Sequence, residues 1–368
     1  MKMLSSTSSS NQRLPRLPRL AWLRILCTAS TALLLWVTAM EVGLALAGFR
    51  PSVLDSEPLW LKQRARADAL GDRALILVGG SRMQLDIDQD VLRRETGLEP
   101  VQLALDASPF ISVFRGIAAD KHITGTVLVD FGDNALTPGY FYAHSKYESD
   151  AERLASQLYI PDFSTLDAGL SDLLHGALRS YADNARPITS LWLRLINRDG
   201  PQQYLFTLPD RSTLADYRLV SMPAYYYRRT SINLGLHGVI PAGSSDAEIQ
   251  ARFREMIAAL KLSDNSFYRQ HIGEVAAMTA AIRARGGRVT FVAFPESGYV
   301  KDIDDRRNPR SAFWDQFATG VGTQTLNFED DPALRQFICP DGSHLDYRQR
   351  AAFTEALVTA LHLHRPAQ

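Results

Sequence analysis

Three residues that are far apart in the chain have the types and local settings needed for nucleophilic catalysis. Ser81 follows an apolar run and two glycines, and Asp341 and His344 share a short segment near the C-terminus. A tight turn after a buried strand holds a serine rigidly, and glycines beside it let a substrate approach the backbone. In an Asp-x-x-His segment the carboxylate can bind one imidazole nitrogen while the other acts as a base. We therefore predict Ser81 as nucleophile, His344 as general base and Asp341 as its orienting carboxylate.

Acyl transfer also needs hydrogen-bond donors for the charge that develops on the attacked carbonyl oxygen. The candidates are the backbone N–H groups of Ser81 and Ala107 and the side-chain amide of Asn134. Each of these residues comes after a short apolar run that reads as a buried strand. Together they are predicted to form an oxyanion hole.

Four other residues near these segments are weaker candidates. Arg82 could bind an anionic substrate group or be a surface residue at a helix start, and Asp106 and Glu296 could line the crevice or be solvated. Cys339 could act as a nucleophile, although an ordinary loop cysteine also explains its position. The other histidines show no spacing typical of metal ligands.

The elements that must position these residues alternate between strands and helices. This order predicts an α/β fold with three layers, α/β/α, and a five-stranded parallel sheet of the flavodoxin-like type. In such sheets ligands bind beyond the carboxyl ends of the strands, where the candidate residues fall. The expected strands are 74–79, 101–105, 125–131, 288–294 and 323–328, and the expected helices include 84–96, 246–262, 266–285 and 347–363.

A tyrosine-rich stretch at about 135–265 interrupts this alternation and has a mostly helical pattern. We treat it as a helical insertion in the domain. It could cap the crevice, form a surface for a partner, rest on a membrane, or simply pack on the core.

The N-terminal region has the pattern of a membrane anchor. Residues 1–24 are basic and lack acidic residues, and residues 25–48 are apolar apart from Glu41. This length suits a transmembrane helix, and the basic flank predicts a cytoplasmic N-terminus. Residues 49–72 would then be a linker, and residues 73–368 an extracytoplasmic domain at the inner (plasma) membrane, periplasmic in a Gram-negative cell. The alternative is a signal peptide cleaved after the small-x-small pattern at 45–47.

The overall composition argues against several other classes of protein. The formal net charge is zero, so no nucleic-acid partner is expected. The two cysteines, Cys27 in the apolar segment and Cys339 in the domain, are predicted to form no disulfide and cannot make a metal cluster. A nucleotide site is disfavoured, since neither a G-x-G-x-x-G motif after the first strand nor a Gly-Lys-Ser/Thr motif occurs.

The arrangement resembles the SGNH (GDSL-like) hydrolase superfamily over residues 74–134 and 286–363. The matching blocks occur in the order of that superfamily: Gly79-Gly80-Ser81, Gly132-Asp133-Asn134 and Asp341-Gly342-Ser343-His344. Two positions depart from the pattern, because Gly80 replaces the usual aspartate and Ala107 replaces the usual oxyanion-hole glycine. Alanine keeps the N–H donor but resists positive φ, so the oxyanion hole could be altered.

The resemblance implies a serine esterase or O-acyltransferase that needs no metal or organic cofactor. The pattern is similar to membrane-anchored members such as the alginate acetylation proteins and the D-alanyl transfer proteins of teichoic acid. It therefore points to an ester substrate such as an O-acylated envelope polysaccharide. One alternative is a long acyl chain, which would make the protein a lipase or thioesterase. Another is a catalytically weak glycan- or partner-binding assembly protein on the same fold.

Overall fold

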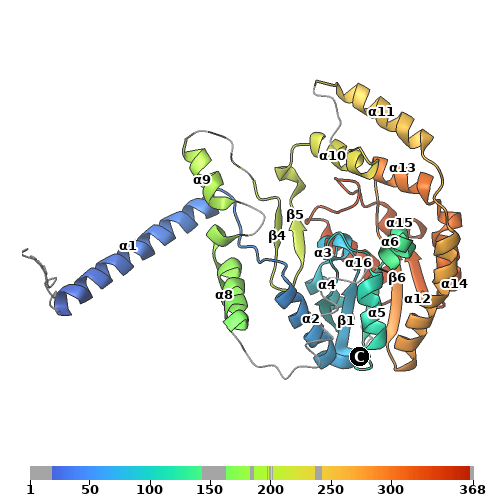
Figure 1. Ribbon diagram of the computed structural model, residues 1–368, viewed down its shortest axis with the longest axis horizontal. Helices are drawn as coiled ribbons and strands as arrows, with labels where there is room; N and C mark the ends of the chain where they lie inside the picture. Colours follow the sequence, from blue (N-terminus) through green and yellow to red (C-terminus); the bar gives the residue numbers. More distant parts are fainter. Residues whose placement is uncertain are drawn as a thin grey trace, which may run out of the picture.

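The computed structural model describes residues 19–142, 163–182, 186–196, 198, 200, 202–236 and 243–364. A five-stranded sheet forms the centre of the molecule, with strand order β2-β1-β3-β6-β7. All four pairs of neighbouring strands are parallel, so the predicted flavodoxin-like order is confirmed (Figure 1). The strands are β1 (Ala74–Val78), β2 (Glu99–Gln102), β3 (Thr126–Asp130), β6 (Arg288–Ala293) and β7 (Gln324–Asn327).

Helices cover both faces of the sheet because side chains alternate between the faces along each strand. In β1, Ile76 and Val78 join one hydrophobic core, whereas Leu75 and Leu77 join the other. The first core is closed by α2 (Glu57–Leu70), α5 (Ile111–Ala119), α12 (Ser266–Ala284) and α14 (Trp314–Gly320). The second is closed by α3 (Ser81–Leu85), α4 (Gln89–Thr96), α15 (Pro332–Arg335) and α16 (Arg350–Ala360).

The region after β1 differs from the single helix predicted over 84–96. It forms two helices, α3 and α4, because Asp88 caps a new helix and accepts the N–H groups of Asp90 and Val91. Since α3 begins at Ser81, the candidate nucleophile is the first residue of a helix. The second strand also begins earlier than predicted, at Glu99.

The insertion combines helices with a β-hairpin that the sequence pattern did not predict. The antiparallel strands β4 (Leu205–Thr207) and β5 (Thr213–Ala215) are only three residues long, too short to show a period. The helices are α6 (Pro138–Phe141), α8 (Phe163–Ala177), α9 (Pro187–Leu195), α10 (Ala224–Asn233) and α11 (Asp246–Ala259), and α13 (Gly298–Arg307) follows β6. Two tyrosines of this region, Tyr147 and Tyr159, lie outside the described residues.

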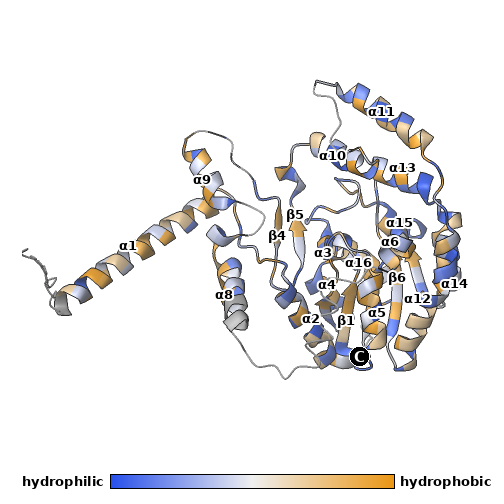
Figure 2. Cartoon of the chain, viewed as in Figure 1, coloured by the Kyte–Doolittle hydropathy of each residue, from blue (hydrophilic) through white to orange (hydrophobic). Residues whose placement is uncertain are grey.

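The N-terminal helix α1 (Arg19–Leu46) projects from the domain (Figure 1). Its segment Ala21–Leu46 is long and apolar enough to cross a membrane, and hydrophobic residues recur along its length (Figure 2). The helix begins before the predicted boundary at residue 25. The predicted linker, 49–72, contains α2, whose Trp60 is buried in the first core.

Candidate active site

Ser81 is held by a glycine turn that is tightly packed against neighbouring loops. A Cβ atom at Gly79 would lie 2.6 Å from Cβ of Asp130, at the end of β3. One at Gly80 would lie 3.2 Å from the carbonyl oxygen of Ser108, in the loop after β2. The two glycines therefore allow the loops after β1, β2 and β3 to meet at one edge of the sheet.

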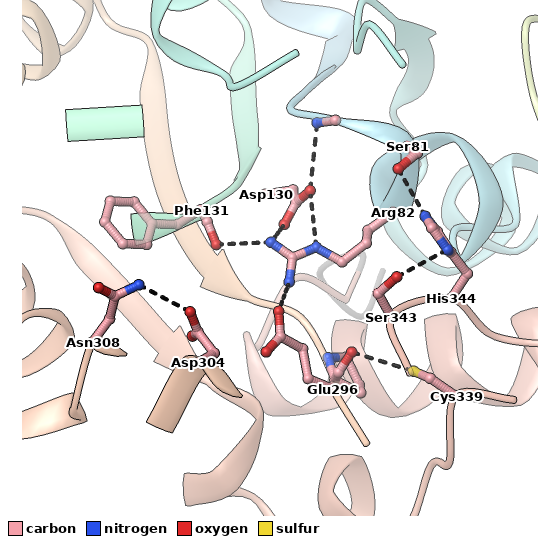
Figure 3. A network of polar contacts seen from close by, with 12 residues as sticks. Ser81, Arg82, Asp130, Phe131, Glu296, Asp304, Asn308, Cys339, Ser343 and His344 are labelled. Atoms are coloured by element: carbon pink, nitrogen blue, oxygen red, sulfur yellow. Dashed lines mark hydrogen bonds and ion pairs between the residues drawn. The ribbon is translucent and has the colours of Figure 1, made fainter. Parts of the chain in front are cut away.

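The structure brings the three predicted catalytic residues together. Ser81 Oγ lies 2.7 Å from His344 Nε2 (Figure 3). On the other side of the ring, His344 Nδ1 lies 2.9 Å from Asp341 Oδ2. Both distances are hydrogen bonds, so the imidazole connects the serine to the carboxylate.

The surroundings of Asp341 keep its carboxylate ionised and hold it in one position. It is 1% exposed, and its Oδ1 atom accepts the backbone N–H groups of Ser343 and His344 at 3.0 and 2.8 Å. Burial alone would raise the pKa of Asp341. The hydrogen bond to His344, the charge of His344 and the Arg229 guanidinium outweigh burial and hold this pKa well below its usual range.

Three polar residues to which the sequence analysis gave no role lie in this loop or next to it. Arg229 Nη2 donates a hydrogen bond to Ser343 Oγ at 2.9 Å, and Ser343 Oγ lies 3.1 Å from His344 Nδ1. Burial, together with the charge of Asp341 and a hydrogen bond to it, raises the pKa of Tyr217, so its phenol stays protonated. Arg229 and Tyr217 both come from the insertion, and no local motif links them to the loop at Asp341.

A second buried carboxyl group, that of Asp86, contacts the residue that follows His344. Asp86 is fully buried, and its Oδ1 atom accepts the backbone N–H of Leu345 at 2.8 Å. Within the described part of the chain, its Oδ2 atom has no hydrogen-bond partner. Burial raises the pKa of Asp86 to about 7, although the charges of His344 and Arg82 oppose this rise. Asp86 thus connects the end of α3 to the loop that carries Asp341 and His344.

The candidate oxyanion donors lie on three adjacent loops. Ala107 has φ +53°, the left-handed conformation that a glycine would adopt more easily. Among the described residues, the N–H groups of Ser81 and Ala107 have no hydrogen-bond acceptor. Asn134 lies shortly after β3, in the short helix Asp133–Leu136, and is exposed. All three positions are at the carboxyl edge of neighbouring strands, as an oxyanion hole requires.

Arg82 is mostly buried in ion pairs, so the interpretation of it as a surface residue is wrong. Its side chain is 16% exposed, with Nη2 at 3.0 Å from Asp130 Oδ1 and Nη1 at 2.9 Å from Glu296 Oε1 (Figure 3). Nη2 also donates to the carbonyl oxygen of Phe131 at 3.2 Å. Burial and the charge of Asp304 raise the pKa of Glu296 to about 7. Arg82 therefore connects the turn that carries Ser81 to the ends of β3 and β6 and stabilises its position.

Cys339 does not have the properties of a nucleophile. Its thiol is buried and donates to the carbonyl oxygen of Pro295 at 3.2 Å. Burial raises the pKa of Cys339, so the thiolate is not formed at neutral pH. Cys27 and Cys339 are both free. Asp106 is exposed on the loop before Ala107.

Comparison with known proteins adds no assignment: neither a protein-family model nor a curated protein matches the chain. Among the described residues, no group of three or more histidine, cysteine, aspartate or glutamate side chains could hold a metal ion. The interpretation of the site therefore depends on its geometry.

Proposed function

We propose that this chain is a membrane-anchored serine esterase or O-acyltransferase of the SGNH type. The observation that carries the proposal is the hydrogen-bonded series Ser81–His344–Asp341, with 2.7 Å from serine to imidazole and 2.9 Å from imidazole to carboxylate. A serine next to an oriented imidazole is the arrangement that acyl transfer requires.

The chemistry proceeds through an acyl-enzyme. Ser81 Oγ attacks the ester carbonyl carbon, and His344 Nε2 takes the serine proton and then gives it to the leaving alkoxide. Asp341 keeps the ring oriented and stabilises the imidazolium. The N–H groups of Ser81 and Ala107 and the Asn134 amide hold the oxyanion. Water completes hydrolysis, whereas a second hydroxyl group completes transfer.

The proposed substrate is an O-acylated envelope glycan. In this arrangement α1 is an uncleaved anchor in the inner (plasma) membrane, and the catalytic domain is extracytoplasmic. An ester with a short acyl group such as acetate is the expected acyl donor. The alternative is an ester with a long acyl chain, and the first experiment distinguishes it from an acetyl ester.

The test is hydrolysis of p-nitrophenyl acetate and p-nitrophenyl octanoate by the full chain in detergent. Ser81→Ala and His344→Ala should each lower kcat/KM by about 10³-fold or more, since the members of such a triad act as one unit. Ser311→Ala is the matched control, because Ser311 is exposed and lies in the short helix Arg310–Ala312, outside the hydrogen-bonded series of the site. The ratio of the two rates on the wild type separates acetyl from long-chain substrates.

Covalent labelling provides the second arm of the test. A phosphonofluoridate should modify the wild type and Ser311→Ala but not Ser81→Ala. A folded wild type that neither hydrolyses the esters nor reacts with this probe would overturn the enzyme and favour the glycan- or partner-binding protein.

A further inference from the structure

Helix α9 carries a row of large apolar side chains that face away from the protein. Ile188, Trp192 and Leu195 are 56%, 64% and 70% exposed. Their spacing of four and three residues puts them on one face of the helix. The opposite face is occupied, because Pro187 and Ser190 are buried.

This helix is attached to the end of α1. Leu191 of α9 lies 3.6 Å from the position of a Cβ on Gly43 of α1. Arg194 Nη1 donates to the carbonyl oxygen of Ala47 at 2.9 Å. In Figure 1, α9 lies across the end of α1 rather than along it.

A carboxylate fixes the same junction from the other side. Glu41 accepts the backbone N–H groups of Arg179 and Ser180 at 2.8 and 2.9 Å. Leu44, Phe49 and Ala182 form a small hydrophobic cluster next to it. The contacts of Glu41 and of α9 therefore hold the end of α1 in a defined position in the insertion.

The length of α1 indicates where this junction lies relative to a bilayer. The apolar segment Ala21–Leu46 has 26 residues, whereas about 20 helical residues cross the hydrocarbon core. If Ala21 lies at one edge of the hydrocarbon core, the other edge falls near Glu41, where a hydrogen-bonded carboxylate is tolerated. The last turn of α1 and helix α9 then lie at the level of the headgroups.

The composition of α9 fits that level. Tryptophan is favoured at the boundary between lipid and water, and arginine extends its charge toward the headgroups. Trp192 is in the exposed row, and Arg186, Arg194 and Arg198 are exposed around the same helix. Both α9 and α1 carry hydrophobic residues along their ribbons (Figure 2).

We propose that α9 lies flat in the outer surface of the bilayer that α1 spans, with Ile188, Trp192 and Leu195 in contact with lipid. This second contact rests on the membrane span proposed for α1 but not on the proposed catalysis. It would orient the domain on the membrane, since one helix alone leaves the domain free to rotate.

The test measures quenching of a fluorescent label by nitroxide lipids, with the full chain reconstituted in phosphatidylcholine vesicles. The variant Leu195→Cys, in a chain that also carries Cys27→Ser, takes the label on the exposed row. Arg254→Cys in the same background is the matched control, on the exposed surface of α11 at the far side of the domain (Figure 1). The parent with Cys27→Ser alone measures any background from the buried Cys339.

A label at 195 should be quenched several-fold more strongly than one at 254, and more by a nitroxide near the headgroup than by one deep in the chain. Trp192→Asp should lower quenching at 195 toward the control value. Quenching at 195 that equals the value at 254 would overturn the proposal. Protection of 195 from aqueous iodide without lipid quenching would also overturn it, because a protein would then cover the helix.

The native Cys27 keeps the two proposals distinguishable. A label on Cys27 in the otherwise unchanged chain should be quenched strongly by membrane nitroxides if α1 spans the bilayer. Quenching at 27 without quenching at 195 refutes only the docking of α9. Loss of both refutes the anchor itself.

Discussion

Ala107 has a backbone conformation that costs free energy for any residue with a side chain. Its φ of +53° belongs to the left-handed region, which is unfavourable by about 1–2 kcal/mol for a non-glycine residue. The strain occurs at one of the proposed oxyanion donors, where the N–H must point toward the substrate. The alanine therefore keeps the glycine-like conformation that the resemblance placed in doubt.

Ala107→Gly should raise the free energy of unfolding by about 0.5–1 kcal/mol, since relief of the strain exceeds the added entropy of the unfolded chain. Denaturant unfolding in detergent measures this change. Ala251→Gly, at an exposed position inside α11, should instead lower stability by about 1 kcal/mol. A loss of stability in both variants would show that Ala107 is not strained.

Sequence reasoning could find the residues that local patterns mark, but not those that the fold brings in. Ser81 and His344 stood out because each lies in a short motif beside a predicted element. Asp86 directly follows α3 and Arg229 lies within α10, and only the packing of distant segments puts them at the loop that carries Asp341 and His344. The burial of Arg82 could not be predicted from local sequence, because it depends on two carboxylates more than 45 positions away.

At the scale of elements, β1, β3 and β6 were predictable because each is a largely apolar run that is buried over most of its length. The edge strands β2 and β7 contain polar residues, and β7 is only partly buried. The hairpin β4–β5 was not predictable, since its three-residue strands are stabilised by tertiary contacts. Tyr347 donates its backbone N–H to Ala215 of β5 at 2.9 Å. The backbone N–H of Tyr217 donates to Asp346 Oδ2 at 3.0 Å. The insertion thus packs directly against the segment that follows His344.

Arg229 of helix α10 is expected to raise kcat by holding Ser343 and Asp341 in position. Arg229→Met removes the hydrogen bond to Ser343 and the charge 3.6 Å from Asp341. A hydrogen bond to a charged group contributes about 1.5–3 kcal/mol, so kcat should fall about tenfold or more while KM stays nearly unchanged. Steady-state kinetics on p-nitrophenyl acetate measure the two constants separately.

The neighbouring residue supplies the control for this positioning role. Arg228 is exposed, so Arg228→Met should leave kcat and KM at wild-type values. Arg229→Lys keeps a positive donor and should recover part of the lost kcat. An equal fall in both methionine variants, or a fall in stability alone, would argue against positioning by Arg229.

At the scale of the whole molecule, the segment between α1 and the domain is held in place by hydrogen bonds. The backbone N–H of Val53 donates to Thr207 of β4 at 3.0 Å, and Ser52 Oγ accepts from the N–H of Thr207 at 2.9 Å. Asp55 makes hydrogen bonds of 2.6 and 3.0 Å to the buried guanidinium of Arg211. With α1 as the proposed membrane anchor, a domain joined to it in this way would keep the candidate active site at a set height above the membrane.

The stability of this connection depends on the carboxylate of Asp55, because Asp55 pairs with the buried Arg211. The side chain of Arg211 is 0% exposed and also donates to the carbonyl oxygens of Gln102 and Ala104, beside the sheet. Asp55→Ala would leave this charge buried without its partner, which costs about 3–5 kcal/mol. The free energy of unfolding of the full chain in detergent should fall by that amount, and trypsin should cut more readily near Arg50.

Asp68→Ala is the matched control for this last prediction. Asp68 also pairs with an arginine, Arg64, but its side chain is 40% exposed. An exposed pair contributes at most about 1 kcal/mol, because water and salt screen it. A similar small loss for Asp55→Ala would mean that Arg211 finds other partners and that the anchor is joined to the domain by a flexible segment. The height of the active site would then be set by the contact of α9 with lipid alone.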